Sequence, residues 1–356
     1  MFYSTRSKIT ISFLGVAVLV CGISLIVGRQ LFYKAVLDEA GSRVSSDLNA
    51  ARELYLSRII DIKTALNLTS IGPIFLSALE KHNDQALINR LSIVAQQTRL
   101  DFMGIVSKDG KTIYRIGPNS TPGDIDPTNP IADLALKKRI AISGTMILSN
   151  KFLFSENPEL AERSRIQVPR TKMAPPGATN EELSGMTLAA AVPIIEAGTF
   201  YGVLYGGVLL NRSQDIVDRI RDTVFQHEMY RDRSIGTASI FLNNLRISTN
   251  VLNPDGSRAI GTIASEEVAQ HVLNEGKKWV DRAFVANDWY ISAYEPIDDI
   301  FGQRVGMLYV GRLEAKYTDV RSKAISMFIL ITVTGIAITA GFGYIIAIKI
   351  SGPPTS

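Results

Sequence analysis

Two long apolar stretches stand out in the pattern of hydrophobic and polar positions along this chain of 356 residues. No charged residue occurs in the 20 positions from 9 to 28, or in the 25 positions from 324 to 348. A helix rises about 1.5 Å per residue, so each stretch is long enough to cross a hydrocarbon core of roughly 30 Å. The first stretch exceeds the apolar part of a signal peptide, about 7 to 15 residues, and no small-residue cleavage site follows it. We therefore expect transmembrane helices at 9–28 and 324–348.

A long helix is predicted directly after the first apolar stretch, over residues 31–70. Apolar residues recur there at spacings of three and four, which is the period of one helix face. They are Val44, Leu48, Ala51, Tyr55, Ile59, Ile62 and Leu66. From Leu31 to Leu68 such a helix would be about 57 Å long, and a helix of this length must rest against something. Either the stripe backs a domain of its own chain, or it pairs with its twin in a homodimer.

Strand and turn signals follow, and they occur twice in the same order. The strands FMGIV and KTIYRIG turn at Asp109–Gly110, and the strands TASIF and LRISTNV turn at Asn243–Asn244. A candidate helix follows each hairpin, then a Pro-Ile dipeptide, and then a closing strand, GVLYGGVLL or GMLYVGRLE. This order predicts an internal repeat of two modules, which we place at 71–212 and 213–317.

The first copy is 31 residues longer than the second, and the excess fits the stretch 150–185. This stretch contains four prolines and shows no sustained period. A long irregular segment inside a compact domain is usually functional or disordered. We expect a lid over a binding pocket, and the alternative is a plain surface insertion.

The phrases GVLYGGVLLNRSQDIVDRI, GTASIF, RISTNV, DGSRAIGT, WYISAYEPI and GMLYVGRLE, in this order, resemble the double-Cache type of extracytoplasmic sensor domain. The resemblance covers roughly residues 38–317. It implies an α+β fold in which a long N-terminal helix carries two PAS-like antiparallel-sheet modules. If the long helix runs outward, the first module would be the membrane-distal one and the second the membrane-proximal one.

The resemblance also implies the ligand-sensing part of a bacterial receptor, of the histidine kinase or chemoreceptor type. Such receptors are two-pass proteins of the inner membrane with a periplasmic domain, and their ligands are amino acids, carboxylates and similar solutes. The second span normally continues into a HAMP segment, so we expect residues 349–356 to be the start of one. The alternative function is an accessory membrane protein whose outer domain binds a protein partner.

Composition argues against several other classes of protein. The net charge of +4 is too diffuse to indicate nucleic-acid binding. Cys21, in the first apolar stretch, is the single cysteine, so disulfides, thiolate metal sites and covalent c-type haem are excluded. The three histidines are not at metal-ligand spacing, and no catalytic motif occurs. We therefore predict no catalytic residues, no metal and no cofactor in this chain.

Candidate ligand-binding residues occur on three predicted strands of the second module. In WYISAYEP, alternation places Tyr290, Ser292 and Tyr294 on one face, with Trp289, Ile291 and Ala293 on the other, against the helices. A similar polar row on the neighbouring hairpin comprises Arg246, Ser248 and Asn250, and Arg282 lies on a third strand. Together these residues could hold a carboxylate between tyrosines. The alternative is a solvated sheet face.

A second set of candidates lies in the first module. Tyr114 and Arg115 are adjacent on a strand, so only one of them can face a pocket. The insertion contributes four cations, Arg163, Arg165, Arg170 and Lys172. An anionic ligand would give these cations a reason to close over it. We therefore predict that a carboxylate-bearing solute binds in the first module, and the alternative is that the charge run is a solvated surface.

Two features bear on assembly and signalling. Besides the long stripe, the small residues Gly335, Thr339 and Gly343 in the second span suit helix pairing, so we expect a parallel homodimer. No glycine or proline occurs between Gly311 and Gly335, so a helix that begins near Lys316 can continue unbroken into the second span.

Overall fold

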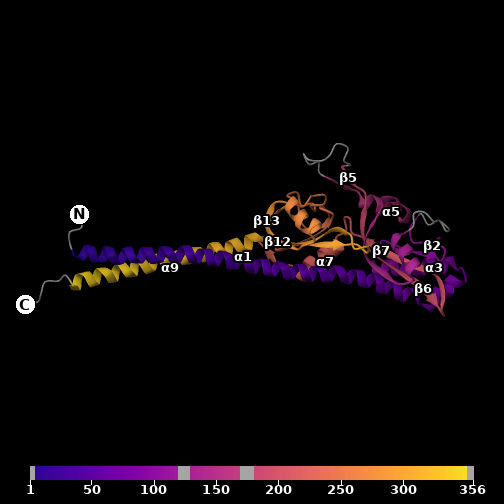
Figure 1. Ribbon diagram of the computed structural model, residues 1–356, viewed down its shortest axis with the longest axis horizontal. Helices are drawn as coiled ribbons and strands as arrows, with labels where there is room; N and C mark the ends of the chain where they lie inside the picture. The colour runs from indigo at the N-terminus through magenta and orange to yellow at the C-terminus, as the bar shows by residue number, and fades with distance from the viewer. Residues whose placement is uncertain (1–4, 119–128, 169–179, 351–356) are drawn as a thin grey trace, which may run out of the picture. The chain divides into compact units, whose positions relative to one another are not determined.

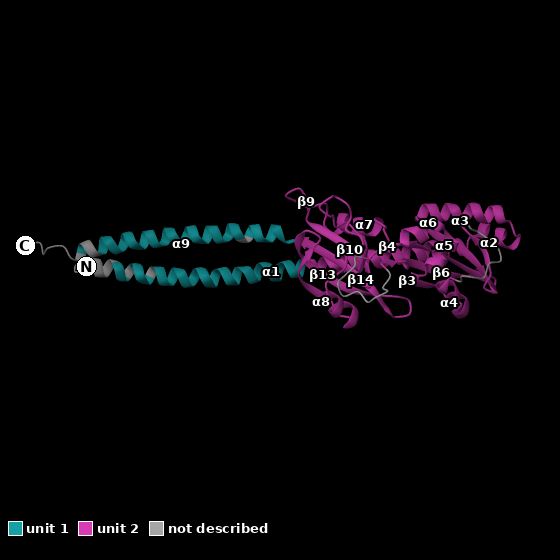
Figure 2. Ribbon diagram, turned by 90° about the horizontal axis from the view of Figure 1, so that it is seen from above, with its two compact units in different colours: residues 1–43, 313–356 teal, residues 44–312 magenta. Residues whose placement is uncertain are grey.

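The computed structural model describes residues 5–118, 129–168 and 180–350. It divides into two compact units, residues 1–43 with 313–356, and residues 44–312 (Figure 2). The second unit contains both predicted modules and the part of the long helix that follows residue 43.

Helix α1 (Thr5–Ser70) is a single helix through the first apolar stretch and the predicted long helix. From residue 44 onward it lies along both modules (Figure 1). The seven residues of the predicted stripe are all 8% exposed or less. Arg52 of α1 forms an ion pair with Glu295 of the second module, and the Tyr55 hydroxyl bonds that of Thr145 in the first. The stripe therefore backs its own modules, which was the alternative to pairing in a dimer.

The first module is built around a five-stranded antiparallel sheet in the order β2-β1-β7-β6-β3. Its strands are β1 (Phe102–Ser107), β2 (Thr112–Arg115), β3 (Ile142–Leu148), β6 (Gly185–Glu196) and β7 (Thr199–Leu209). Its helices are α2 (Pro73–Glu80), α3 (Asp84–Thr98), α4 (Pro130–Lys138), α5 (Asn150–Glu156) and α6 (Pro158–Ser164). A short ribbon, β4 (Ile166–Gln167) with β5 (Glu181–Glu182), completes the described part.

The second module has the same topology, in the order β11-β10-β14-β13-β12. Its strands are β10 (Gly236–Leu242), β11 (Leu245–Thr249), β12 (Trp279–Val285), β13 (Asp288–Asp298) and β14 (Arg304–Leu313). Helix α7 (Asp215–Val224), the ribbon β8 (Met229–Tyr230) with β9 (Arg233–Ser234), and the helical turns α8 (Glu266–Ala269) and η1 (Gln270–Asn274) surround this sheet. The repeated closing phrase forms the central strand of both sheets, β7 and β14, so the predicted repeat and the α+β fold class are confirmed.

The insertion at 150–185 is largely ordered secondary structure where it is described, and its prediction as an irregular stretch was wrong there. Helices α5 and α6 each begin with a side-chain cap, from Ser149 and Asn157 respectively. Phe152 and Leu160 of these helices belong to the core of the first module. Two seven-residue helices separated by Asn157 are too short to show a period in the sequence. Residues 169–179, the middle of the predicted lid, lie outside the described residues.

In the described part of the chain, two helices are long and apolar enough to cross a membrane. One is the N-terminal part of α1, and the other is α9 (Glu314–Ile350), whose apolar windows are exposed. Helix α9 begins at the residue after the end of β14, which confirms the predicted unbroken helix. Of the predicted HAMP-like segment, residues 351–356 lie outside the described part of the chain.

Candidate ligand-binding site

One face of the second sheet carries a buried cluster of tyrosines. Strand alternation places Tyr290 and Tyr294 of β13 on this face, and Tyr309 of β14 joins them from the sheet centre. All three are 7% exposed or less. The ring centroids of Tyr294 and Tyr309 lie 4.7 Å apart. Burial raises the pKa of each hydroxyl above its ordinary value, so these residues are neutral hydrogen-bonding groups at neutral pH. The face is therefore buried, which rules out the alternative of a solvated sheet face for this part.

Arg246 of β11 lies beside this cluster, and it is 5% exposed. Its Nη1 donates to Thr262 Oγ1 over 2.7 Å, and its guanidinium lies 5.0 Å from the centroid of the Phe241 ring. Its buried Nε has no hydrogen-bond partner within the described structure. Burial lowers the pKa of the guanidinium, and the neighbouring groups that raise this pKa are all tyrosines. No carboxylate of the described residues forms an ion pair with Arg246. Among the residues that the structure describes, this buried cation has no anionic partner.

A cavity of about 480 Å³ adjoins the tyrosine cluster. Tyr290 lines it, and so does Thr237, whose hydroxyl lies 3.3 Å from that of Tyr309. Arg233 and Asp288 also line the cavity, and they form an ion pair with an Nη1–Oδ2 distance of 2.5 Å. The cavity is thus lined on one side by charged surface residues, and on the other by Tyr290 of the buried cluster and by Thr237, which contacts Tyr309.

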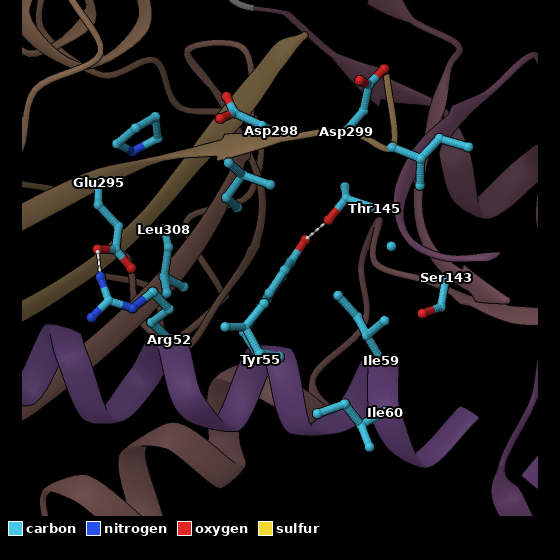
Figure 3. A pocket seen from close by; sticks show the side chains of 15 residues that line it. Arg52, Tyr55, Ile59, Ile60, Ser143, Thr145, Glu295, Asp298, Asp299 and Leu308 are labelled. Atoms are coloured by element: carbon cyan, nitrogen blue, oxygen red, sulfur yellow. Dashed lines mark hydrogen bonds and ion pairs between the residues drawn. The ribbon is translucent and has the colours of Figure 1, made fainter. Parts of the chain in front are cut away.

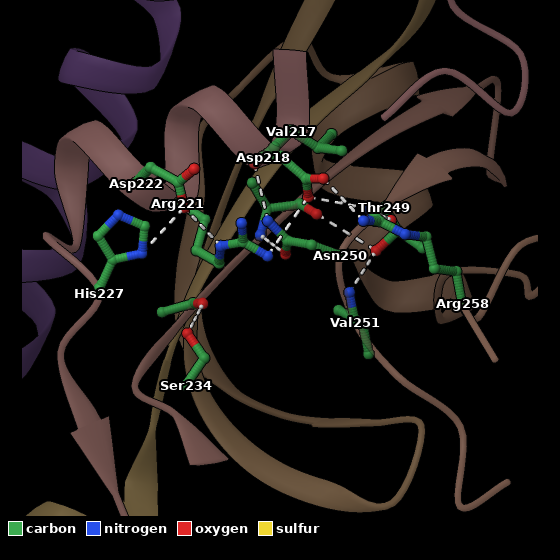
Figure 4. A network of polar contacts seen from close by, with 12 residues as sticks. Val217, Asp218, Arg221, Asp222, His227, Ser234, Thr249, Asn250, Val251 and Arg258 are labelled. Carbon is green, nitrogen blue, oxygen red and sulfur yellow. Dashed lines mark hydrogen bonds and ion pairs between the residues drawn. The ribbon is translucent and has the colours of Figure 1, made fainter. Parts of the chain in front are cut away.

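A polar network fixes one wall of this cavity (Figure 4). Arg258 binds Asp218 of α7 through two hydrogen bonds, 2.9 and 2.7 Å long. Asn250 donates to the carbonyl of Val217 and accepts from the backbone N–H of Ala238. These bonds connect α7 to the hairpin β10–β11, whose second strand carries Arg246.

The first module also buries an arginine, but there a carboxylate of the same module pairs with it. Arg115 is 2% exposed and lies 3.2 Å from Glu156 Oε1, and the Tyr205 hydroxyl donates to the same oxygen over 2.6 Å. Tyr205 is itself next to Gly104, where a Cβ would collide with its hydroxyl. Burial raises the pKa of the Glu156 carboxyl to about 7, although Tyr205 and Arg115 act to lower it. The inner face of this module is otherwise an apolar core.

The remaining first-module candidates lie apart from Arg115. Tyr114 lies on the opposite strand face, as alternation predicts, where its hydroxyl bonds Ser92. Arg163 forms an ion pair with Asp101, and the half-exposed Arg165 lies 3.5 Å from Glu162. Arg170 and Lys172 lie outside the described residues. The described residues therefore do not assemble the predicted cationic site, and ligand binding in the first module stays a prediction.

Two predictions about the second module are corrected by the sheet register. Arg282 pairs with Ile291 rather than with Tyr290, so it lies on the outer face, where it stacks 4.4 Å from the Trp289 ring. Trp289 itself is 47% exposed and does not pack against the helices as predicted. A bulge in the β10–β11 pairing puts Ser248 on the face opposite Arg246, and its hydroxyl binds the carbonyl of Ser213.

Four residues of the site were missed in the sequence: Thr237, Phe241, Thr262 and Tyr309. The signal for Tyr309 was present, because it is the tyrosine of the repeated Leu-Tyr phrase. Thr237 and Phe241 follow from strand alternation once β10 is known to lie beside β14. Thr262 lies in a turn that no short-range pattern connects to Arg246.

A further cavity, of about 410 Å³, lies where α1 meets both modules (Figure 3). Ile59 and Ile60 of α1 and Leu308 of β14 give it an apolar lining, and Thr145 joins it from β3. Its buried acid, Glu295, is neutralised by Arg52 and Lys278. This cavity offers apolar surface and satisfied polar groups, in contrast to the site around Arg246.

Comparison with known families decides the kind of module that carries the site. Residues 208–324 match the family model described as single Cache domain 3. The Cache resemblance is confirmed for these residues. The match spans the whole second module, including the strands that carry Arg246 and the tyrosines. A search of curated proteins finds no match.

Solved structures of sensor domains are similar to this chain at low sequence identity. The periplasmic domain of Vibrio cholerae LuxQ has a TM-score of 0.43 and 14% identity, covering 75% of this chain and 98% of that one. The ligand-binding domain of the Pseudomonas aeruginosa chemoreceptor PctB, in complex with L-Arg, has 0.39 and 12%, covering 80% and 97%. The sensory domain of Campylobacter jejuni Tlp3, with isoleucine bound, has 0.42 and 8%, covering 82% and 97%.

Proposed function

We propose that this chain is the ligand-sensing part of a bacterial transmembrane receptor, and that its second Cache module binds a small carboxylate-bearing solute. The single observation that carries the proposal is Arg246. Burying a cation costs several kcal/mol unless an anion compensates it, and here the described residues supply none. A ligand carboxylate at the free Nε would supply the missing charge and the missing hydrogen bond.

The surroundings of Arg246 suit a small organic anion. Neutral tyrosines offer hydroxyl donors to a carboxylate and apolar rings to the rest of the solute. The adjoining cavity, about 480 Å³, falls within the range of small-molecule sites. Its Arg233–Asp288 pair offers an additional charge of either sign to a zwitterion such as an amino acid.

The proposed signal leaves the module through α9. Strand β14 carries Tyr309 and is followed at once by α9, whose apolar part is the second candidate span. With α1 supplying the first span, both termini would be cytoplasmic and residues 44–312 periplasmic. A displacement of β14 on binding would then reach the membrane without crossing a flexible joint.

A thermal-shift titration of the full chain tests this function. The probes are acetate, succinate, benzoate and L-glutamate, against the wild type and two matched variants, Arg246→Met and Arg282→Met. A ligand of the native state raises the melting temperature by mass action. We expect at least one probe to stabilise the wild type and Arg282→Met but not Arg246→Met, because a hydrogen bond to a charged group contributes about 1.5–3 kcal/mol. An equal response in Arg246→Met would contradict the assignment.

Binding of a protein partner is the second candidate function, and one surface favours it. On the outer face of β12 and β13, Phe284 and Trp289 are exposed and in ring contact, with centroids 5.6 Å apart. Arg282 stacks on Trp289. Aromatic and arginine side chains of this kind are enriched at protein interfaces. No response to any probe in the wild type, with loss of a partner on Trp289→Ser, would favour this function over the first.

A further inference from the structure

Residues 165–167 of the first-module insertion contact the second module on both sides of Arg246. The first contact runs through Arg212, which connects the modules. Its side chain donates to the Arg165 carbonyl from Nη2 and Nε, over 2.9 and 3.3 Å. Its backbone N–H donates to the carbonyl of Ile247, the residue after Arg246, over 2.8 Å. One residue therefore links the insertion to strand β11.

The second contact runs through the turn that holds Arg246 itself. The Arg246 backbone N–H donates to the Thr262 carbonyl, and the Gly261 N–H donates to the Arg246 carbonyl, each over 2.8 Å. The Thr262 hydroxyl also binds the guanidinium. Gly261 lies directly against the insertion, because a Cβ there would come within 2.8 Å of the Gln167 carbonyl oxygen and 3.6 Å of Ile166 Cγ2.

We propose that residues 165–167 of the first module position the Arg246 guanidinium, so that the first module sets the carboxylate affinity of the second. The carboxylate ligand in this inference comes from the proposed function, whereas the contacts of residues 165–167 are independent of it. A binding group must be held within about 0.5 Å of its productive place by the residues behind it. Here those residues come from the insertion, which contacts the neighbouring module.

Two glycines of one loop give a matched test. Gly261 and Gly256 both have left-handed backbone conformations, with φ of 84° and 82°. A Cβ on Gly256 would have no atom within 4 Å, whereas a Cβ on Gly261 would meet the insertion. Gly256→Ala therefore reproduces the backbone strain of Gly261→Ala without its contact. Ile166→Ala is a second variant that removes atoms instead of adding them, and Ile166→Val is its conservative partner.

Two readouts on the full chain separate positioning from general stability. Hydrogen exchange of the amides in residues 245–250 needs no ligand, and affinity is measured with acetate, succinate, benzoate and L-glutamate. We expect Gly261→Ala and Ile166→Ala to speed exchange in 245–250 and to weaken probe binding about tenfold. Gly256→Ala and Ile166→Val should leave both near the wild-type values.

The outcomes distinguish this inference from the proposed function. Exchange in 245–250 that is equal in Gly261→Ala and Gly256→Ala, and unchanged in Ile166→Ala, overturns the positioning role whatever the affinities are. Faster exchange in a protein that binds no probe supports the positioning role and counts against the carboxylate ligand. Faster exchange with unchanged probe affinity overturns the claim that the first module sets the affinity.

Discussion

In each module an arginine is buried on the second strand of the opening hairpin, Arg115 on β2 and Arg246 on β11. The two differ in what surrounds them. Arg115 has Glu156 at 3.2 Å, whereas Arg246 has neutral tyrosines and a hydroxyl. A buried pair is internally neutral, but a lone buried cation requires an anion from elsewhere. The contrast between these two residues supports a ligand in the second module.

The Glu156 carboxyl gives a prediction at the same scale. Its pKa is about 7 in the folded chain against an ordinary 4.5, because burial outweighs the attraction of Arg115. Between these pH values the folded chain binds more protons than the unfolded one, so the free energy of unfolding decreases as pH rises. We expect the melting temperature of the wild type to fall more than that of Glu156→Gln between about pH 5 and pH 8.

The control for that comparison is Glu162→Gln, a change at an exposed carboxylate in the neighbouring helix. It should leave the pH dependence of the wild type unchanged. Parallel melting curves for the wild type and Glu156→Gln across this range would show that the Arg115 pair, and not burial, dominates the Glu156 carboxyl.

Individual side chains were the hardest part of the site to predict from the sequence. Alternation correctly separated Tyr114 from Arg115 and grouped Tyr290 with Tyr294. It failed for Ser248 because a bulge adds one residue to β11, and a period of two cannot detect a register shift. It failed for Arg282 because the face of an edge strand depends on its pairing with β13, which is a tertiary fact.

Local sequence patterns predict most of the secondary-structure elements. The hairpins, the closing strands and the long helix follow from such patterns, and the fold was predictable to that extent. The short helices α5 and α6 were missed because seven residues span about two turns. The direct junction of β14 and α9 was predictable, since it required only the absence of helix breakers. This junction is the element on which the proposed signal transfer depends.

A stiffness change in α9 tests that role. The test uses a chimaera that joins the chain to a receptor output domain. In it, a double variant with Thr318→Gly and Asp319→Gly is compared with a double variant that has alanine at both positions. Glycine costs about 1 kcal/mol per residue relative to alanine in a helix interior, so the first pair weakens the helix without changing its length. We expect the glycine pair to reduce the response to ligand while affinity stays constant. A full response in the glycine pair would refute direct coupling through α9.

For the whole molecule, the expected homodimer stays a proposal. The face of α1 that is available for it differs from the face that the sequence suggested. The predicted stripe is buried against the chain's own modules, but Leu56, Ile60 and Leu68 on the other side are exposed. Their spacing of four and eight places them on one helix face. An exposed apolar face of this kind suits a parallel copy of the same helix.

Crosslinking locates that interface. In a Cys21→Ser background, single cysteines at each position from 53 to 68 are oxidised in membranes. We expect disulfide yield to peak at 56, 60 and 68 with the period of a helix, and to be low at the buried positions 55, 59 and 62. A yield that does not vary along the helix would argue for a monomer.

The position of the bound solute is the most direct test of the central claim, that the second module binds a carboxylate through Arg246. A crystal structure of the full chain with the most stabilising probe would locate it. The account predicts a carboxylate oxygen within about 2.7–3.2 Å of Arg246 Nε, among Tyr290, Tyr294 and Tyr309. A probe bound in the first module, with Arg246 unchanged, would contradict it.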